Sequence, residues 1–146
     1  YGTEVLMDNE EAPGDHGIIR TDFPGGWPGD EVNAFTGEGL SERQAEAKAY
    51  IKSLLNWRKG NETIHHGQLM QFVPHEGVYT IFRYTDEGKV MTILNKNAEA
   101  KTIALDRYAE MLSGTSRGKD VISGRTYPTS GEVELPGKSA LVLEVE

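Results

Sequence analysis

The stretch that decides the fold runs Val78-Tyr79-Thr80-Ile81-Phe82-Arg83-Tyr84, continues through Thr85-Asp86-Glu87-Gly88-Lys89, and ends in Val90-Met91-Thr92-Ile93-Leu94-Asn95. Its two outer parts are short runs rich in β-branched and aromatic residues, which favour extended backbone. The middle part holds Asp86 and Gly88, which are typical turn residues. The stretch therefore predicts two antiparallel strands joined by a short turn.

Similar short runs recur on both sides of this pair, each bounded by Gly, Pro or Ser. They are Gln68–Phe72, Lys101–Leu105, Asp120–Ile122, Thr126–Tyr127, Glu132–Leu135 and Ala140–Val145, with a turn expected over Pro74-His75-Glu76-Gly77. Many short strands at such spacing predict a mainly β fold, either a sandwich or a barrel. Residues 106–112 interrupt them with helix formers, and Asp106 is a candidate N-cap for one short helical turn.

A helix is predicted before the strands, from Glu42 to Lys59. Ser41 and Gln44 have the spacing of a capping box, in which each side chain accepts a hydrogen bond from a free amide at the helix start. Gly60 is expected to end the helix in a left-handed conformation. Apolar residues recur at intervals of three and four, at Ala47, Tyr50, Ile51, Leu54 and Leu55. This apolar stripe requires a surface to pack against.

Residues 5–40 read as a long irregular loop with seven Gly and three Pro. Such a loop is either disordered or functional, and its apolar groups, among them Ile18, Ile19, Phe23, Trp27 and Phe35, favour an ordered one. The charge is also uneven, because residues 1–40 hold nine carboxylates and one cation, Arg20. The other 14 acidic and 14 basic residues balance. An acidic segment of this kind repels phosphate, so no nucleic-acid partner is expected.

Composition sets further bounds. The 146 residues are enough for one compact domain or a small domain with an appendage, and the absence of Cys excludes a disulfide framework. No apolar run approaches the roughly 20 residues that a membrane helix needs, so no membrane partner is expected.

The chain resembles the C-terminal part of α-amylase family glycoside hydrolases, most closely the neopullulanase and cyclomaltodextrinase branch. The resemblance rests on five motifs in order: the strand end Tyr1-Gly2-Thr3-Glu4 with its following loop, the helix exit Trp57-Arg58-Lys59-Gly60-Asn61, the segments His66-Gly67-Gln68-Leu69 and Asp120–Arg125, and the closing segment Val133–Glu144. It implies that residues 1–60 are the end of a catalytic (β/α)8 barrel, with the end of strand eight, its loop and the last helix. Residues 61–146 are then a C-terminal antiparallel β-sandwich of Greek-key-like topology.

The resemblance also implies a function for the longer parent chain, namely retaining hydrolysis of α-1,4-glucans such as starch, pullulan, maltodextrins and cyclodextrins. The family places its catalytic carboxylates on earlier strands, so no catalytic residue is expected here and the segment alone is expected to be inactive. In several members an Asp and an Arg of this loop contact a glucosyl unit, and Asp15 and Arg20 occupy those places. The family usually spaces the two four residues apart with Pro after the Asp, whereas here the gap is five and His16 follows.

Other interpretations stay open at this point. Phe23 and Trp27 are expected either to stack on sugar rings or, more simply, to pin the loop to the barrel with Pro24-Gly25-Gly26 burying both rings. No metal site is predicted at His16, His65, His66 or His75, because adjacent histidines in an extended segment face opposite ways. Asp8-Asn9-Glu10-Glu11 with Asp15 is the better calcium candidate, although it lacks the ordered spacing of a calcium loop.

No cofactor is assigned to this segment, and calcium is kept for the parent enzyme alone. The expected partners are an α-glucan oligosaccharide, bound through the parent, and the upstream barrel of the same chain. A periplasmic or extracellular location is favoured for the parent. The alternative function is a stand-alone carbohydrate-binding β-sandwich without catalysis.

Overall fold

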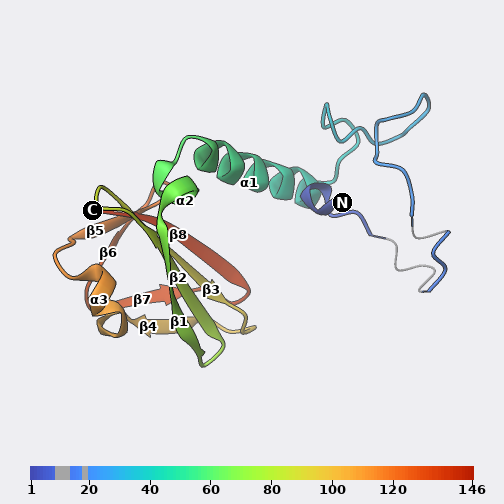
Figure 1. Cartoon of the computed structure of the whole chain (residues 1–146). Helices are drawn as coiled ribbons and strands as arrows, with labels where there is room; N and C mark the ends of the chain where they lie inside the picture. Colours follow the sequence, from blue (N-terminus) through green and yellow to red (C-terminus); the bar gives the residue numbers. More distant parts are fainter. Residues whose placement is uncertain (9–13, 18–19) are drawn as a thin grey trace. The chain divides into compact units, whose positions relative to one another are not determined.

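The computed structural model describes residues 1–8, 14–17 and 20–146. The chain divides into two compact units, Tyr1–Leu55 and Asn56–Glu146, and each is treated by itself below (Figure 1). The boundary falls inside the long helix α1, Glu42–Lys59. The assignment of residues 1–60 to the end of a barrel stays a prediction.

The first unit holds a 3-10 turn, η1 (Thr3–Val5), the described parts of the loop, and most of α1. The predicted bounds of α1 are confirmed, and so is its capping box. The backbone amide of Ser41 donates to Gln44 Oε1 at 3.0 Å, and the backbone amide of Gln44 donates to Ser41 Oγ at 3.3 Å. Two amides that the helix itself leaves without acceptors are thereby satisfied.

The predicted ending of α1 is wrong in its mechanism. Gly60 does not adopt a left-handed conformation, and its amide donates to the Trp57 carbonyl at 3.2 Å. The chain instead starts a second helix, α2 (Glu62–His66), with Asn61 as its N-cap: Asn61 Oδ1 accepts from the Ile64 amide at 3.0 Å. His65 and His66 therefore lie on a helix. The expectation that they lie on an extended segment is wrong.

The second unit is built from eight strands. They are β1 (Gln68–His75), β2 (Val78–Tyr84), β3 (Lys89–Asn95), β4 (Lys101–Ala104), β5 (Arg117–Asp120), β6 (Thr126–Pro128), β7 (Glu132–Leu135) and β8 (Ser139–Val145). One sheet has the order β1-β2-β3-β8-β5-β6 and the other pairs β4 with β7, and all pairs are antiparallel. The last strand returns between β3 and β5, so the predicted fold class, an antiparallel sandwich after a loop and a helix, is confirmed.

One turn and the start of one helix differ from their predictions. β1 continues through Pro74 to His75, with a register shift after Phe72, and only Glu76 and Gly77 form the turn, both at positive φ. Pro74 is tolerated there because β1 is an edge strand, where a missing N–H costs no ladder hydrogen bond. Short helices are confirmed after β4, as η2 (Leu105–Tyr108) and α3 (Ala109–Leu112), but Ala104 stands at the N-cap in place of Asp106.

A third difference concerns Asp120, which ends β5 where a strand over residues 120–122 was predicted. Its Oδ2 accepts from the Ser123 amide at 2.9 Å and from the Ser123 hydroxyl at 2.5 Å. The buried carboxylate thus organises a turn, and this turn overrides the β preference of Val121 and Ile122.

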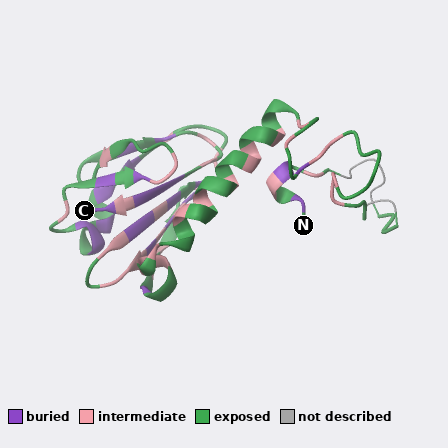
Figure 2. Ribbon diagram, turned by 90° about the horizontal axis from the view of Figure 1, so that it is seen from above, coloured by how far each residue is buried: buried purple, intermediate pink, exposed green. Residues whose placement is uncertain are grey.

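The core of the second unit lies between the two sheets, and its buried residues appear in purple in Figure 2. The large sheet contributes Phe82, Met91, Ile93 and Leu143, the small sheet contributes Ile103, Val133 and Leu135, and η2 and α3 contribute Leu105, Tyr108, Met111 and Leu112. The hydroxyl of the buried Thr80 donates to the hydroxyl of Tyr108, a member of this core, at 2.9 Å. The burial of two hydroxyls is therefore matched by a hydrogen bond.

The C-terminal end of α1 is tied to β8. Trp57 Nε1 donates to Glu144 Oε1 at 2.8 Å, and Asn61 Nδ2 donates to the same oxygen at 3.0 Å. The Trp57 side chain thus contacts the sandwich at β8. Because Asn61 also caps α2, one carboxylate fixes the exit of α1 and the start of α2 on the sheet.

The free edge of β1 is partly blocked against pairing with another strand. Its side chains Leu69 and Val73 are 53% and 79% exposed, and Arg107 Nη2 donates to the Val73 carbonyl at 2.7 Å. Exposed apolar edge strands are templates for pairing with another chain, and a capped carbonyl together with a proline opposes this. The edge is thus closed at Val73 and Pro74.

Replacing Arg107 with Ala is expected to raise the self-association constant of the chain by about 2- to 10-fold, because one edge carbonyl becomes available for pairing. Sedimentation velocity over a range of concentrations measures this. Lys96→Ala, which removes one cation from an exposed position elsewhere in the same unit, is the matched control. Equal self-association of the two variants would show that net charge, and not the capped edge, keeps the chain apart.

Candidate functional site

The candidate site lies in the first unit, where the N-terminal turn and the acidic loop gather polar and aromatic groups. Gly2 and Leu6 flank η1 in left-handed conformations, and Val5 between them is fully buried. A Cβ on Gly2 would come within 2.3 Å of the Met7 sulfur, so this tight turn requires glycine. The hydroxyl of Tyr1 donates to the carbonyl of Thr21, which ties the turn to the loop.

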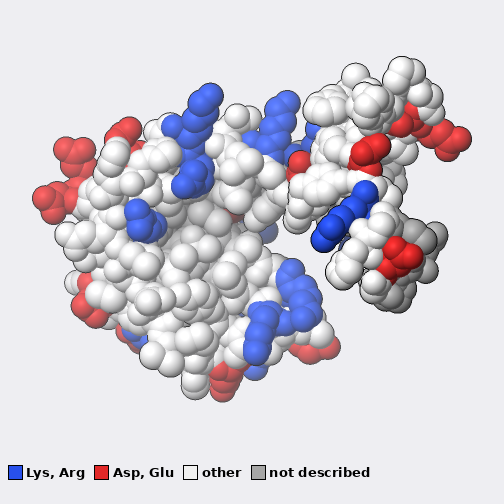
Figure 3. Space-filling view, turned by 45° about the vertical axis from the view of Figure 1, so that its right-hand side comes forward, with Lys and Arg blue, Asp and Glu red and all other residues white. Residues whose placement is uncertain are grey.

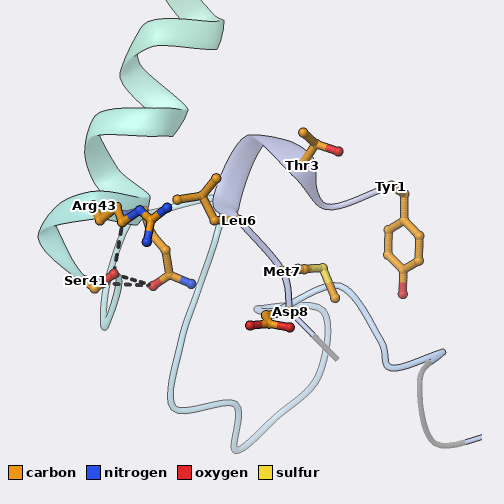
Figure 4. Close-up of a pocket in the computed structure, with 8 residues that line it drawn as sticks. Tyr1, Thr3, Leu6, Met7, Asp8, Ser41 and Arg43 are labelled. Atoms are coloured by element: carbon orange, nitrogen blue, oxygen red, sulfur yellow. Dashed lines mark hydrogen bonds between the residues drawn. The ribbon is translucent and has the colours of Figure 1, made fainter. Parts of the chain in front are cut away.

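A hollow of about 620 Å³ opens beside this turn (Figure 4). It is lined by Tyr1, Thr3, Leu6, Met7, Asp8, Ser41, Arg43 and Gln44. Asp8 and Arg43 bring a carboxylate and a guanidinium to the same hollow, and both groups bond well to hydroxyl-bearing ligands. Sequence reasoning singled out Asp8 only as part of the calcium candidate, and Arg43 only as part of the capping sequence, so it predicted no shared site for the two.

The two predicted subsite residues lie on the described parts of the loop. Asp15 and Arg20 are both exposed, and Asp15 Oδ1 accepts from the Gly17 amide at 2.9 Å. This short turn fixes one carboxylate oxygen locally. Ile18 and Ile19, two of the apolar residues that favour an ordered loop, lie between them and are outside the described residues. The roles of Asp15 and Arg20 in sugar binding stay a prediction.

The two aromatic residues of the loop have different surroundings in the first unit. The Phe23 ring is half-buried and packs edge-on against Phe35, with centroids 5.4 Å apart. Trp27, by contrast, is 65% exposed. Asp30 accepts hydrogen bonds from the amides of Gly25 and Trp27 and shapes the turn that carries this indole. The interpretation that Phe23 and Trp27 pin the loop to the barrel stays a prediction.

The metal predictions stand as follows. Asn9, Glu10 and Glu11 of the calcium candidate lie outside the described residues. Among residues 1–8, 14–17 and 20–146, no group of three His, Cys, Asp or Glu side chains is placed to hold a metal ion. His65 and His66 have ring centroids 6.2 Å apart on α2, and both are exposed.

None of the described helices is long and apolar enough to cross a membrane.

The charged side chains of the surface form no single basic stripe on the face drawn in Figure 3, where Lys and Arg lie in separate groups. The carboxylates of the first unit outnumber its cations near the candidate site. A neutral ligand rich in hydroxyl groups suits such a surface, because carboxylates accept hydrogen bonds from hydroxyls and repel phosphates.

Known structures share this fold. An AmyP variant in complex with maltotriose aligns with a TM-score of 0.66 and 20% identity over 82% of this chain and 23% of that one. An Anoxybacillus α-amylase aligns with a TM-score of 0.63 and 15% identity over 99% of this chain and 28% of that one. An α-amylase from Geobacillus thermoleovorans, complexed with acarbose, aligns with a TM-score of 0.60 and 12% identity over 81% and 28%.

At these identities the likeness is one of fold, and the chain spans less than a third of the length of each of these structures. The family is identified by a match of the sequence to a family model. The model of the cyclo-malto-dextrinase C-terminal domain matches residues 69–144, which cover β1 to β8 almost entirely. With the sandwich, its strand order and this match in place, the chain belongs to the cyclo-malto-dextrinase C-terminal domain family.

Proposed function

We propose that this chain is the C-terminal part of an α-amylase family glycosidase that acts on α-glucans. Residues 61–146 are its C-terminal sandwich, and residues 1–60 are the end of its (β/α)8 barrel. The family match over residues 69–144 supports the first assignment. The second rests on the order of elements before the sandwich and on α1.

The observation that carries the proposal is the uncovered apolar side of α1. No residue of this 18-residue helix is buried (Figure 2). Two residues of its apolar stripe, Tyr50 and Leu55, are 38% and 55% exposed. The other two large members, Ile51 and Leu54, are only half-buried. A helix with an apolar stripe gains its stability in a folded protein by packing that stripe. The upstream barrel of the same chain is the partner that this stripe requires.

The carbohydrate-binding alternative finds less support. Sugar sites commonly use exposed aromatic rings that stack on the faces of pyranose units. In the described part of the second unit, the exposed large apolar side chains are Leu69, Val73 and Leu94, none of them aromatic. The exposed aromatic residues Tyr1, Trp27, Phe35 and Tyr50 all belong to the first unit. Sugar contacts are thus better sought in the loop than on the sandwich.

In the parent, hydrolysis needs a carboxylate nucleophile and a carboxylic acid about 5 to 5.5 Å apart, as in other retaining glycosidases. The resemblance places both on earlier barrel strands. Asp15 and Arg20 are proposed to hold a glucosyl unit on the non-reducing side of the cut, through charge-assisted hydrogen bonds to adjacent hydroxyls. The sandwich then has a stabilising role.

We expect the 146-residue chain alone to release no reducing sugar from maltodextrins, whereas the parent encoded by the same gene releases it readily. A reducing-end assay on both proteins at equal molar concentration tests this. Replacing the parent's catalytic carboxylates should abolish its activity and leave the second unit folded. Reducing-sugar release by the purified chain itself, scaling with its concentration, would overturn the proposal.

A further inference from the structure

The indole of Trp27 is a large flat apolar surface that the first unit leaves in water. It is 65% exposed, and it forms no ring contact with any described aromatic residue. Phe35 is equally exposed, but its ring is occupied edge-on by Phe23. Trp27 therefore differs from Phe35 in being exposed without a ring contact to any described aromatic residue.

The backbone beneath this ring is held firmly. Asp30 Oδ2 accepts from the amides of Gly25 and Trp27, at 2.7 and 3.2 Å, and the Asp30 amide donates to the Trp27 carbonyl at 3.3 Å. Gly25 is at φ +96°, and a Cβ there would lie 2.6 Å from Asn33 Oδ1. A residue with a Cβ would therefore be strained at this position, so the turn requires glycine.

A second layer of hydrogen bonds supports the turn. The Ala34 amide donates to the Pro24 carbonyl at 3.0 Å, and the Asn33 amide donates to the Glu38 carbonyl at 2.8 Å. Asn33 Oδ1 accepts from the amides of Phe35 and Thr36 at 2.9 and 3.0 Å. These bonds hold the backbone that carries the ring before a ligand binds, and preorganisation of this kind lowers the cost of binding.

The flank of the same turn is hollowed and acidic. A cavity of about 270 Å³ is lined by Asp22, Phe23, Pro24, Asp30, Glu31 and Val32. Its carboxylates accept hydrogen bonds from hydroxyl groups and repel anions. A neutral pyranose suits a loop with these two features, because its apolar ring face can stack on an indole and its hydroxyls can donate to carboxylates.

We propose that Trp27 is a stacking surface for a glucosyl unit of an α-glucan. Asp30 acts as a positioning residue, because its contacts hold the turn and not the sugar. The choice of an α-glucan rests on the proposed function. The binding surface itself rests only on the first unit, and it is formed in the 146-residue chain.

The chain holds two tryptophans, which provide a probe and an internal control. The Trp27 indole is exposed, whereas the Trp57 indole N–H is bonded to Glu144 in the second unit. Titration of the ¹⁵N-labelled chain with maltoheptaose, followed through the two indole N–H signals, is expected to shift the Trp27 signal with a Kd of about 1 to 10 mM and to leave Trp57 in place. The variant Trp27→Phe assigns the signals.

Variants and a control ligand sharpen the test. Followed through backbone amide signals of the loop, Trp27→Ala should abolish the response, whereas Phe35→Ala, which removes an equally exposed ring, should retain it. Asp30→Asn should weaken binding severalfold, while the chemical shifts of the second unit stay unchanged. Cellotetraose, a β-linked glucan, should bind at least fivefold more weakly, and equal binding would overturn the assignment to α-glucans.

No shift of Trp27 at 50 mM maltoheptaose would overturn the inference, because the surface is formed in this chain. Its failure is distinct from failure of the proposed function. If the parent cleaves maltodextrins but the Trp27 signal does not shift, the inference about Trp27 is wrong and the proposed function stands. If the Trp27 signal shifts but the parent has no α-glucan hydrolase activity, the binding surface stands and the proposed function is wrong.

Discussion

Phe82→Ala is expected to lower the free energy of unfolding of the second unit by about 3 to 5 kcal/mol. Phe82 is fully buried at the centre of β2, with ring centroids 5.8 Å from Phe72 and 6.3 Å from Tyr108. Truncation removes the apolar contacts of the ring and leaves a cavity between the two sheets. Since small domains have a total stability of about 5 to 15 kcal/mol, this single change removes a large fraction of it.

Urea unfolding followed by Trp57 fluorescence, in a Trp27→Phe background, reports on the second unit alone. The matched control is Phe35→Ala, the same chemical change at a ring that is 69% exposed in the first unit. It should leave the midpoint of the second unit unchanged. If Phe82→Ala does not fold, Phe82→Leu supplies a measurable loss of about 1 to 2 kcal/mol. A loss below about 0.5 kcal/mol in either variant would contradict a core position for Phe82.

Elements with a strong local signal could be predicted from the sequence. The bounds of α1, β2 and β7 agree with their predictions, because a capping box, a run of β-branched and aromatic residues, and flanking Gly and Pro each act within a few residues. The sandwich itself follows from the recurrence of such runs. The strand order could not be predicted this way, because the return of β8 to a place beside β3 is decided by long-range packing.

The errors have physical causes at particular residues. The short helix α2 has too few residues to show a period, and its only local sign is the Asn61 cap. The segment Val121-Ile122 has β propensity, but the buried carboxylate of Asp120 bonds to Ser123 and forms a turn there. Propensity is a weak guide wherever a side chain offers the backbone another hydrogen-bonding arrangement.

The candidate site was predicted less completely than the fold. Asp15 and Arg20 were chosen through a family resemblance, and no pattern in the chain itself marks them. The exposure of Trp27 depends on Asp30 accepting from two amides of one turn, which residue order alone does not reveal. Similarly, Asp8 and Arg43 are 35 positions apart in sequence, and only the fold places them around one hollow.

Replacing Asp15 or Arg20 with Ala in the parent enzyme is expected to reduce kcat/KM for long maltodextrins by about 10- to 100-fold, which corresponds to the loss of about 1.5 to 3 kcal/mol of charge-assisted hydrogen bonding. Short substrates that do not reach this subsite should be cleaved almost as before. Fold stability should change by less than about 0.5 kcal/mol, because both residues are exposed. Glu38→Ala, at another exposed carboxylate of the loop, provides a comparison.

The contact of Asp15 with Gly17 separates a local role from a binding role. Asp15→Asn keeps the oxygen that accepts from the Gly17 amide but removes the charge. If Asp15 binds sugar as a carboxylate, Asn should lose most of the activity on long substrates that Ala loses. Full rescue by Asn would mean that the residue serves only the turn. Equal losses on long and short substrates would indicate that Asp15 and Arg20 hold the loop, and a double-mutant cycle would then show strong coupling between them, because removing either partner would already have removed the interaction.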